Sequence, residues 1–400
     1  MIIMGKLTKL TMKYSYNDIM VVPAILSSIQ HRAECNPYYK NGMLPLFTAP
    51  MDSVVNKDNF DLFEKHGIIP ILPRTESLED RLKFAYNGKW AAFSLKEFED
   101  EFTIVDAKSE LGVNTIRVLI DMANGHVERL YDAVKTAKGI YDDIIEIMVG
   151  NIANPETYRV CVESQVDYVR CSVGTGAGCI TCSNTAIGYP IASLISEIAA
   201  IKQEYMNSGI YNNNSLPKII ADGGIRNYND IIKAIALGAD YVMCGSIFSK
   251  MLESASVKVM DRGFSEGGKK IRLRFPIEHY ENLRYEDEGW VGDYTDEFIE
   301  EMAKNGHKAE KENHAIGTIY AKFYGMASRA GQIAMKGKKV HTSEGIEKML
   351  EVTYTIKTWV ENMTDYLQSA MSYTNSRTLD ELKQAEVVIV SMNTYNSINK

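Results

Sequence analysis

A glycine-rich loop that ends in a cysteine is the segment of this 400-residue chain best suited to covalent chemistry. The sequence GTGAGC (174–179) places three glycines ahead of the thiol of Cys179. Glycines let a backbone approach a ligand closely, and an ionised thiol attacks an electron-poor carbon. A tight turn around a buried cysteine would use the same residues, and the loop by itself leaves both interpretations open.

A second cysteine adds two further interpretations of this loop. Cys179 and Cys182 form a C-x-x-C pair, which is typical of a redox couple or of half a zinc site. The sequence contains no second C-x-x-C, and its seven histidines show no metal-ligand spacing. We therefore favour a nucleophile and keep the redox pair and the zinc ligand as alternatives.

Two later loops carry groups that could hold a sugar phosphate. They are Asp222-Gly223-Gly224 and Gly245-Ser246. Backbone N–H groups in such loops can bind a phosphate. The carboxylate of Asp222 would repel a phosphate and is better suited to accept hydrogen bonds from a ribose diol. Turn formation explains the glycines without a ligand, but it explains the aspartate less well.

Two more acids have more than one interpretation. Asp121 could hold a ribose, including that of a nicotinamide cofactor, or it could cap a helix over 126–137. Glu344 lies in a segment without apolar periodicity, where a carboxylate is normally solvated at the surface.

Eight short apolar runs predict the elements that position these groups. Each run is too short for a buried helix and fits a strand buried on both faces of a parallel sheet. Segments of helical character separate them, including 59–67, 126–139 and 228–238. The predicted strands are 46–50, 68–72, 90–94, 116–121, 145–150, 166–171, 218–223 and 240–245.

This alternation predicts an α/β protein, a (β/α)8 TIM barrel, with an open doubly wound sheet as the alternative. The catalytic groups of such a barrel lie at the carboxyl ends of its strands, where the loops described above occur. We predict a barrel over 1–249 and 316–400, with a charged and partly helical insertion over 250–315 after the eighth strand. Residues 326–345 are expected to form a mobile active-site flap, and 346–374 a helix.

Composition and charge narrow the class of protein. The formal net charge of −8 argues against a nucleic-acid-binding protein. The amino terminus lacks the features of a signal peptide, and no apolar run approaches the roughly 18 residues of a membrane span. The six cysteines show no regular framework, which favours a reducing compartment. We expect a soluble cytoplasmic protein with neither a nucleic-acid nor a membrane partner.

Together, the loops resemble those of one known family. The segment APMDSV (49–54) opens the series, and the match covers roughly 14–249 and 320–395, most of the chain. The set resembles the family of IMP dehydrogenases and GMP reductases, whose most specific motifs here are the cysteine loop and the IIADGGIR segment. The other segments are DMANGH (121–126), GNIANPET (150–157), VGTGAGCIT (173–181), IIADGGIR (219–226), ALGADYVMCGS (236–246), FYGMAS (323–328) and SEGIE (343–347).

The resemblance implies a homotetrameric barrel enzyme that binds a purine nucleoside monophosphate (GMP or IMP) and a nicotinamide cofactor. It implies that Cys179 bonds to purine C2, that Thr181 and Glu344 move a proton, and that Asp222 holds the ribose. Further implied nucleotide contacts are Ser53, Gly223, Gly224, Gly245, Ser246, Tyr324, Gly325, Met326 and Gly345. Implied nicotinamide contacts are Asp121, Ala123, Asn124 and Gly174, and carbonyl groups of Gly174, Gly176 and Cys179 would hold K⁺.

Within the family the sequence favours the reductase, which forms IMP and ammonia from GMP with NADPH. Dehydrogenases usually carry inserted CBS domains, whereas only residues 95–115 separate the third and fourth predicted strands. The flap lacks the Arg-Tyr pair with which dehydrogenases activate water, because Arg329 is followed by Ala330. The sequence SEG (343–345) resembles the reductase motif whose glutamate pairs with the loop threonine.

Some positions depart from the family pattern and keep two alternatives open. Gly178 precedes the cysteine where the family has serine or lysine, and Cys182 replaces a basic residue. Residues 248–250 read Phe-Ser-Lys in place of Leu-Ala-Gly, and the insertion is longer than in reductases. The alternatives are an IMP dehydrogenase, which forms XMP with NAD⁺, and a diverged relative that acts on another purine ribo- or deoxynucleotide.

Overall fold

The computed structural model describes most of the barrel and part of the insertion. The described residues are 11–103, 115–213, 215–266, 269–273, 280–286, 289–294, 318–335, 342–343 and 345–391, with the single residues 300 and 304.

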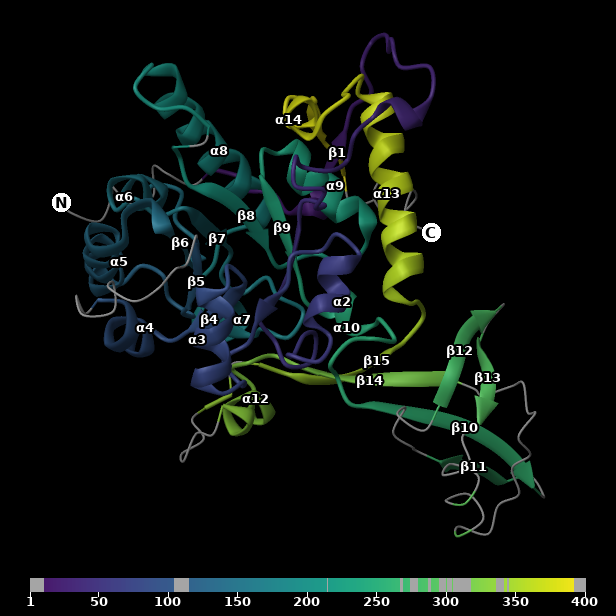
Figure 1. Cartoon of the computed structure of the whole chain (residues 1–400). Helices are drawn as coiled ribbons and strands as arrows, with labels where there is room; N and C mark the ends of the chain where they lie inside the picture. Colours follow the sequence, from purple (N-terminus) through teal and green to yellow (C-terminus); the bar gives the residue numbers. More distant parts are fainter. Residues whose placement is uncertain are drawn as a thin grey trace, which may run out of the picture.

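Eight parallel strands form the centre of the molecule, in the spatial order β2-β9-β8-β7-β6-β5-β4-β3 (Figure 1). The two ends of this order meet where Thr48 N–H donates to the Ile69 carbonyl at 3.0 Å and Ile69 N–H donates to the Leu46 carbonyl at 2.9 Å. The predicted (β/α)8 barrel is therefore confirmed, and the open doubly wound sheet is excluded. The strands are β2 (Leu46–Thr48), β3 (Ile71–Leu72), β4 (Trp90–Phe93), β5 (Ile116–Asp121), β6 (Ile145–Ile152), β7 (Tyr168–Cys171), β8 (Lys218–Asp222) and β9 (Tyr241–Cys244).

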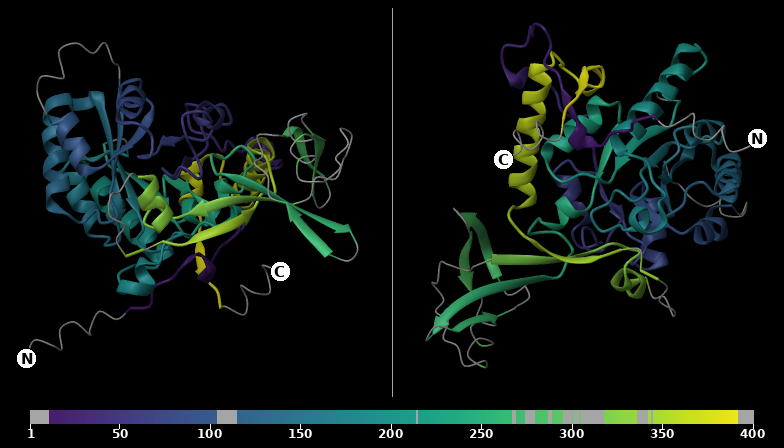
Figure 2. Two further views of the ribbon diagram at one scale, coloured as in Figure 1. Left: turned by 90° about the horizontal axis from the view of Figure 1, so that it is seen from below. Right: turned by 180° about the vertical axis from the view of Figure 1, so that it is seen from behind.

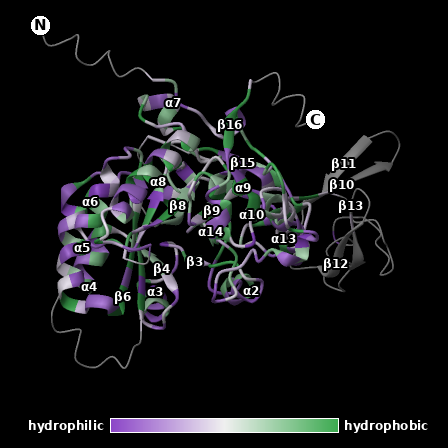
Figure 3. Cartoon of the chain, turned by 90° about the horizontal axis from the view of Figure 1, so that it is seen from above, coloured by the Kyte–Doolittle hydropathy of each residue, from purple (hydrophilic) through white to green (hydrophobic). Residues whose placement is uncertain are grey.

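Helices surround the barrel, as two further views show (Figure 2). They carry both hydrophilic and hydrophobic residues (Figure 3), and their buried apolar residues share one core with residues of the strands. Ser77, Ser94 and Asn227 each cap a helix by accepting a backbone N–H of its first turn. In the described part of the chain, no helix has both the length and the apolarity that crossing a membrane requires. The helices are α2 (Phe60–Lys65), α3 (Leu78–Tyr86), α4 (Leu95–Phe102), α5 (Glu128–Tyr141), α6 (Thr157–Glu163), α7 (Thr181–Thr185), α8 (Ile191–Asn207), α9 (Tyr228–Ala236), α10 (Ser246–Ser249), α12 (Arg329–Ala334), α13 (Ile356–Tyr373) and α14 (Leu379–Leu382).

Both faces of the barrel strands are buried, which explains their uninterrupted apolar sequences. Along β4, Trp90 and Ala92 belong to the core inside the barrel, whereas Ala91 and Phe93 belong to the core between strands and helices. Burial on both faces fixes the register of each strand, because a slip by one residue would exchange the two sets.

Four aromatic rings fill the amino-terminal end of the barrel interior. Trp90, Tyr168 and Tyr241 are the first residues of their strands, and Phe47 is the second residue of β2. The centroid distances within this group are 5.0 to 6.1 Å, and most of the rings meet edge to face. The open end of the barrel is therefore the carboxyl end of the strands.

The insertion after β9 forms strands that project from the barrel (Figures 1 and 2). A four-stranded antiparallel sheet has the order β11-β10-β14-β15, and β12 pairs with β13. Trp290 on β13 is buried, and its Nε1–H donates to the Val352 carbonyl at 2.8 Å. The bounds are β10 (Lys258–Glu266), β11 (Lys269–Leu273), β12 (Tyr280–Glu286), β13 (Gly289–Tyr294), β14 (Thr318–Tyr324) and β15 (Glu347–Glu351).

The helix predicted over 346–374 is wrong in its first part. Residues 347–351 form β15, and α13 begins only at Ile356, where Thr355 provides the cap. Strand β15 pairs with β14, which lies far away in sequence, so a local apolar pattern could not reveal it. Of the predicted helical content of the insertion, the described part shows helical backbone at Glu300 and Lys304, and its other elements are strands.

Three further short helices and one strand pair complete the described structure. Strands β1 (Ile19–Val21) and β16 (Val387–Ile389) pair antiparallel and join the two ends of the described chain. The 3-10 helices are Tyr16–Asp18, Arg32–Glu34 and Asp142–Ile144.

Asp240, which directly precedes β9, should contribute strongly to stability. Its carboxylate accepts hydrogen bonds from Lys202 Nζ at 2.7 Å and Lys383 Nζ at 2.8 Å. Burial alone would raise the pKa of Asp240, but the two lysines outweigh it and hold the pKa below its ordinary value. The group therefore stabilises the fold above about pH 4, and this contribution is lost as the pH falls. We expect Asp240→Ala to lower the free energy of unfolding by about 3 to 5 kcal/mol, because Lys202 stays buried without its partner.

Urea denaturation at neutral pH measures this loss. Asp61→Ala is the matched control, because Asp61 pairs with Lys89 but its side chain is 81% exposed. Equal losses in the two variants would contradict the special role of the buried pair.

Candidate active site

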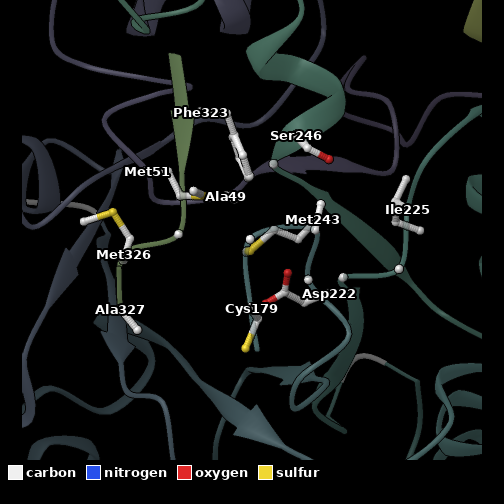
Figure 4. Close-up of a pocket in the computed structure, with 17 residues that line it drawn as sticks. Ala49, Met51, Cys179, Asp222, Ile225, Met243, Ser246, Phe323, Met326 and Ala327 are labelled. Carbon is white, nitrogen blue, oxygen red and sulfur yellow. The ribbon is translucent and has the colours of Figure 1, made fainter. Parts of the chain in front are cut away.

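The carboxyl ends of the strands enclose a cavity of about 710 Å³, counting the space open to solvent. Met51, Met243 and Met326 line it together with Phe323. Such a soft apolar wall suits a flat heteroaromatic ring. Figure 4 shows Cys179, Asp222 and Met243 in the middle of the cavity. The other lining residues are Ala49, Gly176, Ala177, Gly178, Gly223, Gly224, Ile225, Gly245, Ser246, Gly325 and Ala327.

Cys179 follows the glycine loop after β7 and lies partly exposed in this cavity. Its Sγ–H donates to Thr181 Oγ1 at 3.2 Å, and its N–H donates to the Gly176 carbonyl at 3.0 Å. The exposure of the thiol excludes the interpretation as a turn around a buried cysteine. The thiol and its neighbouring hydroxyl can instead meet a ligand, one as nucleophile and the other as a proton carrier.

Cys182 has a different environment from Cys179. Its thiol lies 3.2 Å from the Val173 carbonyl and 2.8 Å from the Ile187 carbonyl. Burial, helped by the nearby Cys179, raises the pKa of Cys182. A raised pKa lowers the share of thiolate, which makes Cys182 a poor nucleophile. All six cysteines are free thiols.

Glycines hold the cysteine loop against the base of the flap segment. A Cβ on Gly178 would lie 2.9 Å from Gly325 N, and one on Gly345 would lie 3.0 Å from the Gly178 carbonyl oxygen. That carbonyl accepts Ile346 N–H at 3.0 Å, and Cys179 forms an antiparallel bridge with Gly345. The contact gives a physical reason for glycine at 178, because a larger residue would push the two segments apart. Glu344 lies outside the described residues.

Asp222 ends β8 and presents one carboxylate oxygen to three donors. Its Oδ2 accepts Arg170 Nε at 3.1 Å, Arg170 Nη2 at 2.9 Å and Asn151 Nδ2 at 2.7 Å. No donor from the described residues reaches Oδ1. This second oxygen is therefore available to the hydroxyl groups of a ligand in the cavity.

The two glycines after Asp222 bring this loop against the cysteine loop. Gly223 has a φ of +91°, and a Cβ there would lie 2.7 Å from Thr175 Oγ1. The Gly224 N–H donates to the Thr175 carbonyl at 3.0 Å, so that amide is already engaged. At the neighbouring strand end, Gly245 and Ser246 line the cavity.

Tyr324 and Ser53 lie outside the lining of the main cavity, although the family resemblance implies that both contact the nucleotide. The hydroxyl of Tyr324 donates to Asp52 Oδ2 at 2.6 Å, and the adjacent Phe323 faces the cavity instead. Ser53 is buried, and its carbonyl accepts the Ser249 hydroxyl at 2.9 Å.

A second cavity of about 730 Å³, counted in the same way, opens beside the ends of β4 and β5. Asp121 and Ala123 line it, whereas Asn124 is exposed outside it and Gly174 lines neither cavity. Asp121 Oδ1 accepts Arg170 Nη1 at 2.6 Å, and α5 has no side-chain cap, so the helix-cap interpretation of Asp121 is wrong. The other lining residues are Arg74, Ser94, Leu95, Lys96, Glu99, Met122 and Arg129.

The second cavity contains a buried donor that a polar ligand could satisfy. Arg74 Nε is buried there and has no hydrogen-bond partner among the described residues, while its Nη1 donates only a long bond, 3.4 Å, to the Asp121 carbonyl. A buried donor without an acceptor is costly, and a ligand carbonyl or phosphate would satisfy it.

Two residues of the site have no role in the predictions made from the sequence. Arg170 and Asn151 both hold Asp222 in place. One signal was present for Arg170: it interrupts the apolar run VDYVRC, and an arginine in a strand buried on both faces needs anionic partners.

The sequence of the chain is similar to those of known proteins over most of its length. Residues 13–270 match the family model described as "IMP dehydrogenase / GMP reductase domain". The chain is 24% identical over 394 residues to a GMP reductase of Staphylococcus carnosus, covering 96% of this chain and 98% of the relative. It is 25% identical to a GMP reductase of Shouchella clausii, covering 96% and 97%. A GMP reductase of Lactobacillus delbrueckii subsp. bulgaricus is 26% identical, with 94% of each chain covered.

Proposed function

Because this chain belongs to the IMP dehydrogenase / GMP reductase family, we propose that it is a GMP reductase, which converts GMP to IMP and ammonia with NADPH as reductant. The observation that carries the proposal is the placement of Cys179, beside Thr181 and in one cavity with Asp222. A thiol, a proton-carrying hydroxyl and a ribose anchor are the groups that this reaction needs around a purine nucleotide.

The residues of the main cavity have separate roles in the proposed reaction. Cys179 Sγ forms a bond to purine C2, and the C2–N bond to the amino group then breaks. Thr181, with Glu344, supplies the proton with which the amino group leaves as ammonia. NADPH, when bound in the second cavity, would supply a hydride to C2; the S–C2 bond would then break, and the Cys179 thiolate would take up a proton to become a thiol again. Met51, Met243 and Met326 surround the base and keep water away from it.

The rest of the nucleotide would be held at the ends of β8 and β9. Asp222 Oδ1 accepts the ribose hydroxyls, and the Ser246 hydroxyl with the N–H groups of Gly245 and Ser246 binds the 5′-phosphate. Gly224 shapes the loop rather than donating, because its amide is engaged. Gly325 and Gly345 bring the flap segment to the cysteine loop, and Tyr324 supports it through Asp52.

Three observations support the reductase over the dehydrogenase. The strands β4 and β5 are separated by residues 94–115, which leaves no room for a pair of CBS domains. The flap sequence has no Arg-Tyr pair to activate water. Gly345 pairs with Cys179, and the sequence SEG that Gly345 ends resembles the reductase motif.

The cofactor and the assembly complete the proposal. Arg74, Asp121 and Ala123 would hold NADPH in the second cavity. A K⁺ ion at carbonyl groups of Gly174, Gly176 and Cys179, a homotetramer and a cytoplasmic location remain part of the proposal. The Gly176 carbonyl already accepts one N–H and keeps one lone pair for such an ion.

An absorbance assay of the purified protein tests the function directly. We expect NADPH absorbance to decrease with GMP and no NADH or NADPH to appear with IMP and the oxidised cofactors. Reduction of NAD⁺ in the presence of IMP would identify a dehydrogenase, and turnover of another purine nucleotide in place of GMP would identify the diverged relative.

Glu344→Gln should slow ammonia release more than hydride transfer, because it removes the acid of the proposed proton relay. The kinetic isotope effect measured with deuterated NADPH should then fall toward 1, since hydride transfer ceases to limit the rate. Glu347→Gln is the matched control, because Glu347 pairs with Lys322 at 3.5 Å on the strand next to the flap. A slower turnover of Glu344→Gln with the isotope effect of the wild-type protein would contradict the proton role of Glu344.

A further inference from the structure

Arg170 connects the two cavities of the active site. It lies on β7 and is 7% exposed, in a strand whose other side chains are mostly apolar. Its guanidinium donates to Asp222 through Nε and Nη2 and to Asp121 through Nη1. Asp222 lines the main cavity and Asp121 lines the second cavity. One buried cation therefore joins an acid in each.

The strand order explains why this connection is possible. Strands β5, β6, β7 and β8 are neighbours in the barrel, and Asp121, Asn151, Arg170 and Asp222 come from them in that order. Asn151 Nδ2 fills the remaining gap by donating to Asp222 at 2.7 Å. Two carboxylates face one guanidinium, so the unit keeps one net negative charge for ligands on either side.

The planar fork of arginine is essential to this arrangement. Its N–H groups point in fixed directions and reach two carboxylates at once, with distances of 2.6 to 3.1 Å. A lysine ammonium is a single point that could approach one acid closely and would release the other.

We propose that Arg170 is a positioning residue that couples nucleotide binding to cofactor binding, by holding Asp222 and Asp121 in one unit. This inference rests on the proposed function. A ligand on Asp222 fixes the carboxylate and with it the guanidinium, so the carboxylate of Asp121 is ordered before the second ligand arrives. The second ligand then loses less conformational entropy on binding, and the effect is reciprocal.

Calorimetric titration of GMP with and without saturating NADP⁺ tests the coupling without turnover, because the cofactor in this pair is already oxidised. For the wild-type protein we expect NADP⁺ to lower the Kd of GMP by about 5-fold or more. In Arg170→Lys, GMP should still bind, with the ratio of the two Kd values close to 1. Arg117→Lys is the matched control, because Arg117 pairs with Glu146 at the other end of β5, and it should keep the wild-type ratio.

Asp121→Asn provides a second measurement if Arg170→Lys fails to fold or to bind GMP. It removes the charge that holds Nη1, keeps the side-chain shape, and should abolish the coupling in the same way. A wild-type ratio retained in either variant would overturn the inference while leaving the reductase proposal intact. Failure of the wild-type protein to bind GMP would overturn both.

Discussion

Cys179→Ala should abolish turnover of GMP while leaving GMP bound with nearly wild-type affinity. The substitution removes the sulfur that forms the bond to C2 but none of the groups proposed to hold the ribose and the phosphate. Loss of a nucleophile typically lowers kcat by a factor on the order of 10⁴ or more. Steady-state kinetics measures the first effect and calorimetric titration of GMP the second.

Cys182→Ala is the matched control for this prediction. It removes a thiol from the same loop, three residues away, whose contacts are the carbonyl groups of Val173 and Ile187. We expect kcat to fall by less than about 100-fold, the loss that a small misplacement of reacting groups causes and far below the loss of a nucleophile. Equal inactivation of both variants would favour the redox pair over a single nucleophile.

Asp222→Asn should weaken GMP binding on the order of 10- to 100-fold, because a hydrogen bond to a charged group is replaced by one to a neutral amide. The substitution keeps the shape of the side chain. It removes the negative charge that faces Arg170, and it replaces one carboxylate oxygen by an amide nitrogen. Calorimetric titration of GMP measures the loss. Asp167→Asn is the matched control, since Asp167 forms an ion pair with Lys138 at 2.7 Å at the amino-terminal end of β7.

The preference between ribo- and deoxynucleotides should depend on Oδ1 of Asp222. Wild-type protein should bind GMP more tightly than 2′-deoxy-GMP, because Oδ1 can accept both ribose hydroxyls. Asp222→Asn should reduce this preference. Tighter binding of the deoxynucleotide by the wild-type protein would instead support the diverged relative.

Local patterns were sufficient to predict the barrel and to place several candidate site residues at one end of it. Seven of the eight apolar runs contain a whole strand of the barrel, and β6 extends two residues beyond its run, because burial on both faces leaves a signature within a few residues. Cys179, Asp222 and Ser246 could be placed at the barrel mouth because the carboxyl ends of parallel strands meet at one edge. Their presence in one cavity agrees with that argument.

The remaining features depend on partners that are distant in sequence. Strand β15 exists because it pairs with β14, and its own residues do not alternate clearly. The hydroxyl of Tyr324 faces Asp52, and the flanking Phe323 takes the cavity side, a difference of one residue that the sequence FYGM could not decide. Asp121 also depends on a partner distant in sequence, because it pairs with Arg170 on another strand and does not cap the next helix.

The four aromatic rings at the amino-terminal end close the described barrel interior there, so the carboxyl end is the side from which ligands can enter. Phe47, Trp90, Tyr168 and Tyr241 stop the described interior from serving as a passage to the far side. In the proposed reaction, the nucleotide, the hydride donor and the released ammonia must therefore all pass through the carboxyl end of the barrel. The loops at this end therefore control the order of ligand binding and product release, and slow release of one product there would delay the binding of the next ligand.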